Sequence, residues 1–125
     1  MKDKNDNEKF KKEFKKRLYT LVLRTIGLLD KLPKDNISQR MADQLVRSIT
    51  SILANYVEGL SASSKKDFTN FFNHSLKSAN ESRVWFVLLR DSGRVPQNEA
   101  SWFLKELKEV ANIFGSSILT LRGKR

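Results

Sequence analysis

The side chains that could do chemistry in this sequence are mostly cationic. Of its 125 residues, 24 are Lys or Arg and 14 are Asp or Glu, which gives a formal net charge of +10. A surplus of this size creates a field that attracts polyanions such as RNA, DNA or acidic lipid. A solvated helical surface with a lysine bias would have the same composition, so the two interpretations differ in whether the charge clusters in space.

The groups that usually carry catalysis are sparse. His74 is the only histidine and there is no cysteine, so a nitrogen–sulfur metal site cannot form. The sequence has no glycine-flanked nucleophile elbow and no Gly-rich phosphate loop. Glu58 and Glu81 could act as a carboxylate pair, but each is explained more simply as an ion-pair partner on a helix. We expect no catalytic residue, no metal and no cofactor, and therefore a protein that is not an enzyme and works by binding.

The elements that must position these side chains are four long helical segments. Apolar residues recur every three or four positions over about 8–31, 37–58, 65–91 and 99–122. Sparse prolines and glycines mark three short turns between them, so consecutive helices must be antiparallel neighbours. The sequence predicts an all-α fold, an up-down-up-down antiparallel four-helix bundle over residues 8–125, preceded by a flexible polar tail at 1–7.

Single residues indicate where these helices begin and end. Pro33 disfavours a helical conformation of the residue before it, so the first helix should stop there. Gly59 can take the left-handed conformation that closes a helix. Ser64 with Asp67 three residues later is a capping-box pattern at the start of the third helix, and Asn98 is a candidate cap for the fourth.

Small and polar residues interrupt the apolar stripes of the second and third helices. Arg47 belongs to a polar ridge beside the apolar stripe, where a partly buried arginine needs a partner. Glu81 is the candidate for a structural ion pair with Arg47, and a solvated polar face is the alternative. Small residues at helical spacing, which favour close packing of the two helices, are Ser48, Ser51 and Ala54, then Ser75, Ser78, Ala79 and Ser82.

There are also more apolar residues than one face of each helix requires. The main inward stripes include Phe10, Ile26 and Val57. Large exposed apolar patches are rare on monomers. We therefore predict a homo-oligomer that associates through side faces carrying the remaining apolar residues, which are Tyr19, Leu23, Leu28, Trp85, Val87 and Trp102.

The predicted topology gathers basic residues at one end. The start of the first helix, the turn after the second and the end of the fourth share that end, whereas the opposite end is balanced in charge. A clustered basic end suits a phosphate backbone, with little dependence on base sequence. No aromatic stacking motif accompanies the basic run, so base reading is not predicted. The candidate nucleic-acid-binding residues are Lys11, Lys12, Lys15, Lys16, Arg17, Lys65, Lys66, Arg122, Lys124 and Arg125.

Membrane partners are disfavoured by the same patterns. No window reaches the roughly 18 apolar residues of a membrane span, and the first ten residues lack the apolar centre of a signal peptide. The first helix is basic and amphipathic, as are helices that lie on membranes, but the bundle core needs its apolar face. We expect a cytoplasmic protein that binds no membrane.

The second helix carries a more specific pattern, DQLVRSITSILANYVEG at 43–59. It resembles the signature of a bacterial four-helix-bundle family encoded in intervening sequences of large-subunit ribosomal RNA genes. The segments 14–19, 63–68 and 76–81 look like the same family, so the resemblance covers nearly the whole chain after the tail. Within the pattern, Arg47 and Glu81 look like an interhelix pair, and Asn55 looks like a cap or an interhelix hydrogen bond.

The family resemblance implies a homopentamer, a barrel of five bundles. It also implies relatives that serve as the accessory variability determinant of diversity-generating retroelements and bind a reverse transcriptase and nucleic acid. The leading hypothesis is a non-enzymatic, oligomeric scaffold that holds RNA or an RNA–DNA intermediate by its phosphates at the basic end, as a retroelement accessory or a ribosomal-RNA-associated protein. The alternative is a protein-interaction adaptor without direct nucleic-acid binding, whose partner is acidic or is the polymerase itself.

Overall fold

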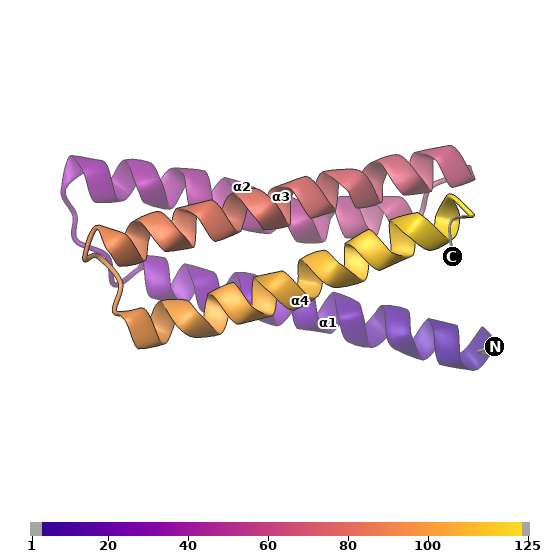
Figure 1. Ribbon diagram of the computed structural model, residues 1–125, viewed down its shortest axis with the longest axis horizontal. Coiled ribbons are helices and arrows are strands. Elements are labelled where there is room, and N and C mark those ends of the chain that lie inside the picture. Colours follow the sequence, from indigo (N-terminus) through magenta and orange to yellow (C-terminus); the bar gives the residue numbers. More distant parts are fainter. Residues whose placement is uncertain (1–3, 124–125) are drawn as a thin grey trace.

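The protein is a bundle of four long helices joined by three short connections. The computed structural model describes residues 4–123. The helices are α1 (Lys4–Leu29), α2 (Asn36–Leu60), α3 (Lys65–Asp91) and α4 (Gln97–Leu121), and no strand occurs over these residues. Consecutive helices run antiparallel, so α1 begins and α4 ends at the same end of the bundle as the α2–α3 connection (Figure 1). The predicted all-α, up-down-up-down bundle is confirmed.

The first helix begins earlier than its apolar periodicity indicates. α1 starts at Lys4, four residues before Glu8, so most of the predicted polar tail is helical. Asp6 lies in the first turn, where a carboxylate interacts favourably with the positive end of the helix dipole. The rest of the predicted tail, residues 1–3, lies outside the described residues.

Two of the predicted helix ends hold and two are corrected. Pro33 lies in the turn after α1, and the Ser64 hydroxyl accepts a hydrogen bond from the Asp67 backbone N–H at 3.1 Å. The residue that precedes α4 is Pro96, which supplies no side-chain cap, so Asn98 lies inside the helix and caps nothing. Gly59 also lies inside its helix, without a positive φ, and α2 continues to Leu60.

Gly59 is explained by packing. A Cβ atom built on this residue would lie 3.1 Å from the Phe71 Cβ and 3.1 Å from two atoms of the Phe72 ring. Contacts this short are closer than ordinary van der Waals separation, so glycine lets α3 approach α2 here. The expectation of a left-handed helix end at this position was wrong.

A serine-rich contact joins α2 to α3. The hydroxyls of Ser48 and Ser82 lie 2.8 Å apart, and the Ser75 hydroxyl donates to the Ile52 carbonyl at 2.9 Å. All three serines are buried. The predicted facing of small residues is therefore confirmed, except at Ala54, which is exposed.

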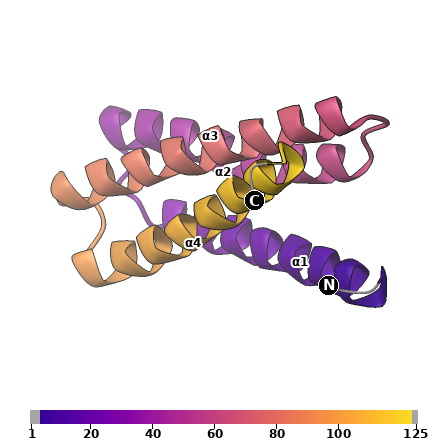
Figure 2. The same ribbon diagram turned by 45° about the vertical axis from the view of Figure 1, so that its right-hand side comes forward.

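The core is continuous but its outline differs from the predicted stripes. Phe10, Ile26 and Val57 were expected to point inward and are exposed, whereas Leu28 was expected on a side face and is buried. The N-terminal half of α1 diverges from α3 and α4 (Figures 1 and 2), and Phe10 on this half is 42% exposed. Leu28 lines a small pocket together with Arg94, Val95 and Pro96 of the α3–α4 connection and is 8% exposed. The largest fully buried side chains include Leu18, Leu45, Ile49, Phe86, Leu89, Leu107 and Phe114.

Candidate nucleic-acid interface

The end of the bundle that holds the N-terminus of α1, the α2–α3 connection and the C-terminus of α4 is here called the basic end (Figure 1). Lys11 is half-buried and makes a long ion pair with Glu8 at 3.5 Å. Acidic residues at this end, such as Glu13 and Asp67, are fewer than the cations. The exposed cations of this end among the described residues are Lys9, Lys12, Lys15, Lys16, Lys65, Lys66 and Arg122, and Lys124 and Arg125 lie outside those residues.

Arg17 does not belong to this exposed set. Its Nε donates to Glu106 Oε2 at 2.7 Å, and its Nη2 donates to Glu106 Oε1 at 2.8 Å and to Glu109 Oε1 at 3.0 Å. The hydrogen bond to Glu106 raises the pKa of the Arg17 guanidinium above its usual value. Its donors are directed at α4, so Arg17 ties α1 to α4 in this structure and is not available to a phosphate.

Arg47 and Glu81 are brought together as a pair that joins α2 to α3. Arg47 Nη2 donates to Glu81 Oε2 at 2.5 Å, and the Trp85 indole N–H donates to the same oxygen at 3.1 Å. The side chains are 59% and 39% exposed, so the pair bridges the two helices at the surface and is not buried between them. Exposed pairs contribute about 0 to 1 kcal/mol to stability.

Asn55 has a different role from the two expected. Its side-chain amide donates to the Ser51 carbonyl and to the Ser51 hydroxyl, both at 2.9 Å and both within α2. The Ser51 hydroxyl in turn accepts from Ser78 of α3 at 2.9 Å. Asn55 thus reaches the neighbouring helix only through Ser51.

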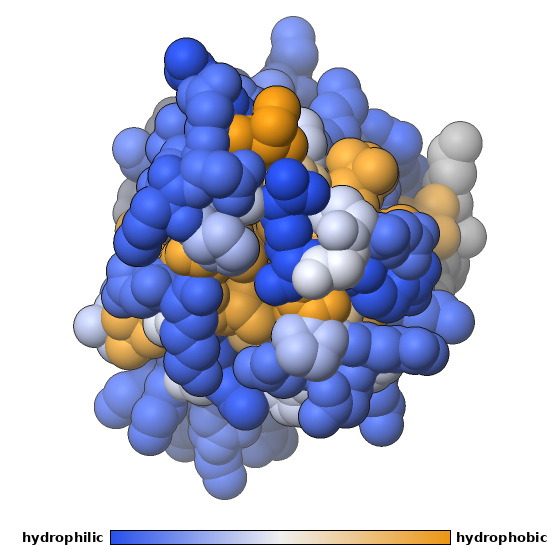
Figure 3. All heavy atoms as spheres, turned by 90° about the vertical axis from the view of Figure 1, so that its left-hand side faces the viewer, coloured by the Kyte–Doolittle hydropathy of each residue, from blue (hydrophilic) through white to orange (hydrophobic). Residues whose placement is uncertain are grey.

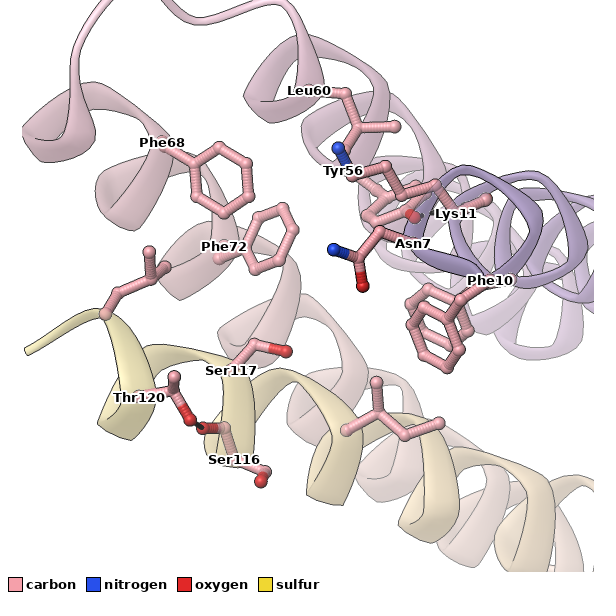
Figure 4. A pocket seen from close by; sticks show the side chains of 13 residues that line it. Asn7, Phe10, Lys11, Tyr56, Leu60, Phe68, Phe72, Ser116, Ser117 and Thr120 are labelled. Carbon is pink, nitrogen blue, oxygen red and sulfur yellow. Dashed lines mark hydrogen bonds between the residues drawn. The ribbon is translucent and has the colours of Figure 1, made fainter. Parts of the chain in front are cut away.

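The basic end also contains a pocket that the sequence did not indicate. It has a volume of about 630 Å³ and is lined by residues of all four helices. Rings of Phe10, Phe68 and Phe72 form much of its wall, and the Asn7 amide and Ser117 hydroxyl point into it (Figure 4). Because these residues are far apart in the chain, only the splayed course of α1 relative to α4 reveals that they surround one space.

The opposite end is here called the closed end. Arg94 Nε donates to the Ser38 hydroxyl at 2.7 Å, and that hydroxyl donates to Asp35 Oδ1 at 2.6 Å. These bonds connect the start of α2 to the α3–α4 connection. The surface at this end is mostly hydrophilic, with smaller hydrophobic areas between the polar side chains (Figure 3).

Exposed apolar side chains occur on all four helices, and pairs of them one helical turn apart lie on α1 and on α3. On α1, Tyr19 and Leu23 are 55% and 50% exposed, and on α3, Val84 and Leu88 are 56% and 44% exposed. Of the side-face residues predicted from the sequence, Trp85, Val87 and Trp102 are only half-exposed. Arg24 of α1 covers the Trp102 ring at 3.8 Å, which explains why that indole is not open.

The described residues offer little that resembles a catalytic or metal centre. His74 is exposed on α3, and the carboxylates of Glu58 and Glu81 are not paired with each other but lie apart, Glu81 with Arg47. Within residues 4–123, no group of three or more His, Cys, Asp or Glu side chains is placed to hold a metal ion. Over the same residues, no helix is both long enough and apolar enough to cross a membrane.

The fold and the polarised charge define a small all-α bundle with one basic end. The family model described as 23S rRNA-intervening sequence protein matches residues 11–116, and the chain belongs to this family. A solved structure from Bacteroides thetaiotaomicron, a protein of unknown function from the S23 ribosomal protein family, is 30% identical. The match covers 83% of this chain and 96% of that one, with a TM-score of 0.78. No curated protein matches the chain.

Proposed function

We propose that this protein is a non-enzymatic, oligomeric scaffold that binds RNA or DNA through phosphate groups at its basic end. The observation that carries the proposal is the set of exposed lysines that α1 and the α2–α3 connection present together at that end. Such contacts release condensed counterions, and they give affinity with little sequence preference.

The lysines of α1 are favourable ligands because they are not engaged elsewhere. Lys12, Lys15 and Lys16 are exposed and make no ion pair within residues 4–123. A phosphate that binds them need not displace a carboxylate, in contrast to the situation at Arg17. The proposed interface is therefore the lysine set without Arg17.

The exposed apolar faces support assembly into a closed ring. A twofold dimer would need one self-complementary face, whereas two different faces favour head-to-tail contacts, which close into a ring when the rotation permits. Tyr19 and Leu23 supply one face, and Val84 and Leu88 supply the other. In a ring of parallel bundles all basic ends lie on the same rim, and the family resemblance implies five copies.

The cellular role follows from the partner. We place the protein in the cytoplasm, as a ribosomal-RNA-associated protein or as an accessory of a diversity-generating retroelement that also binds the reverse transcriptase. A neighbouring reverse transcriptase gene with a repeat pair would favour the retroelement, and a position inside a ribosomal RNA gene would favour the first role.

The test is a salt titration of binding with a charge-matched control. Labelled RNA and DNA are titrated with wild type and with a variant in which Lys11, Lys12, Lys15 and Lys16 are all changed to Gln. The loss of four phosphate contacts should reduce the steepness of the plot of log affinity against log salt by about 3 units of slope. The control variant removes four exposed cations elsewhere and leaves the net charge equal to that of the first variant: Lys31→Gln, Lys34→Gln, Arg40→Gln and Lys77→Gln.

The outcomes separate three interpretations. A large loss in the first variant and a small loss in the control supports the basic end as the interface. Equal losses mean that the charge acts only as a diffuse field. No binding by the folded wild type at low salt overturns the proposal and leaves a protein-interaction adaptor.

A further inference from the structure

We infer that the pocket at the basic end accepts an unstacked base of a single-stranded nucleic acid whose phosphates bind the surrounding lysines. The inference rests on the proposed function and adds a ligand class, single strands, and a specific site. It concerns a space of about 630 Å³, which falls within the usual range of small-molecule pockets in proteins.

Aromatic rings form much of the pocket wall. The Phe10 ring is 42% exposed and lies parallel to the Phe14 ring, with a centroid distance of 5.9 Å and an interplanar angle of 16°. On the other side of the pocket, the rings of Phe68 and Phe72 are 4.3 Å apart (Figure 4). Single-strand-binding proteins use exposed rings as platforms for bases. The exposed Phe10 and the half-exposed Phe68 present such rings here, whereas Phe72 is buried.

Two polar side chains line the pocket between these rings and α4. Asn7 points its amide between the rings, and Ser117 points its hydroxyl into the same space from α4 (Figure 4). An amide both donates and accepts, as does a hydroxyl, so together they match the mixed donor and acceptor edge of a base. Neither side chain makes a hydrogen bond to another of the described residues.

Cationic side chains surround the pocket. Lys11 lines it, Arg122 directly follows its lining residue Leu121, and Lys65 precedes its lining residue Phe68 by one helical turn. A purely apolar ligand would gain nothing from these cations, whereas a nucleotide has an aromatic base for the pocket and a phosphate for the lysines. The charge therefore favours a nucleotide unit of a strand over an apolar side chain of a protein.

The experiment compares two strands with the same phosphates. A labelled single-stranded DNA oligonucleotide and an abasic oligonucleotide of equal length are titrated against the full chain at one low salt concentration. If a base enters the pocket, the abasic strand should bind at least about tenfold more weakly, the size expected for losing base–aromatic stacking.

Two variants locate the effect. Phe10→Ala removes a stacking surface, and Ser117→Leu fills the space from α4 without changing the charge. Each should reduce affinity for the base-bearing strand to that of the abasic strand while leaving the abasic strand's affinity unchanged, and Phe10→Trp should retain tight binding. Ile37→Ala, which removes an exposed apolar side chain near the closed end, is the control and should change neither affinity.

The failures of the two proposals are distinguishable. Equal wild-type affinity for the two strands, with steep salt dependence, overturns the base pocket and leaves phosphate binding intact. The pocket would then be open to a partner protein's apolar side chain. A folded wild type that binds neither strand at low salt overturns both. If Ser117→Leu does not fold, Phe10→Ala and its Trp counterpart decide the question.

Discussion

At the closed end, Arg94, Ser38 and Asp35 form a chain of short hydrogen bonds between α2 and the α3–α4 connection. At the basic end, the helices are joined mainly by aromatic rings, and α1 diverges from α3 and α4. The closed end uses its polar side chains to hold the fold, whereas at the basic end Lys12, Lys15 and Lys16 make no ion pair within residues 4–123 and a pocket lies open. The same four helices therefore separate a structural end from an end available for binding.

The largest effect should come from the rings that support the basic end. Phe114 is fully buried, and its ring contacts those of Phe14, Tyr56 and Phe72 at 5.3–5.9 Å between centroids. Phe114→Ala should lower the free energy of unfolding by about 3–5 kcal/mol, the usual cost of such a cavity. Leu119→Ala, an exposed change on the same helix, should cost far less. Denaturant unfolding measures both, and similar small losses would show that the rings do not hold this end.

The close approach of α2 and α3 gives the next effect. Gly59→Ala should destabilise the protein by about 1–3 kcal/mol, because the new Cβ would meet Phe71 and Phe72 at 3.1 Å. Gly27 is the matched control, since nothing lies within 4 Å of its Cβ position in α1. Gly27→Ala should stabilise the protein by roughly 0.5–1 kcal/mol through helix propensity. Thermal unfolding would contradict this reasoning if both variants shifted in the same direction.

The fold was predictable because its signals are local and repeat along the chain. Apolar periodicity located four helices, and the short turns made them antiparallel neighbours. The pattern from Ser64 to Asp67, four residues long, predicts the cap that the structure shows. A glycine near a helix end is explained either by a left-handed helix end or by the close approach of another helix, and at Gly59 only the position of Phe72 on α3 distinguishes the two.

The candidate site was predictable only in part because it depends on distant partners. The topology predicts the lysines at one end and predicts Arg17 among the phosphate-binding residues there. Nothing near Arg17 in the sequence shows that Glu106 and Glu109 face it from α4. The available signal for this ion pair was that Glu106 and Glu109 lie three residues apart on α4. The pocket gave no signal, because its walls come from four segments and its opening depends on how far α1 diverges.

Arg17 and Lys16 offer a direct test of that distinction. Arg17→Ala should lower stability by about 1 kcal/mol, as expected for a partly exposed ion pair, and leave nucleic-acid affinity nearly unchanged. Lys16→Ala should leave stability unchanged and remove about one phosphate contact, which lowers nucleic-acid affinity. Urea unfolding and binding anisotropy on the two variants measure both quantities. A loss of affinity in Arg17→Ala without a loss of stability would return Arg17 to the interface.

The smallest effect should be a response of the closed end to acid. The hydrogen bond from the Ser38 hydroxyl, followed by that from the Ser38 backbone N–H, lowers the pKa of Asp35 below its usual 3.8. The folded state therefore binds this proton less tightly than the unfolded state does. The stability that Asp35 contributes is complete above pH 3.8 and is lost as the pH falls through the lower folded pKa.

Asp35→Asn should consequently lose less stability than wild type when urea unfolding is followed from about pH 5 to about pH 2. Asp91, whose pKa is lowered by the hydrogen bond from Arg90, also lies at the closed end, so adding Asp91→Asn should flatten the acid response further. Parallel curves for wild type and the single variant would mean that the Ser38 hydrogen bonds do not favour the ionised carboxylate. In that case the closed end would be held by packing of its apolar residues, and its contrast with the basic end would lie in charge alone.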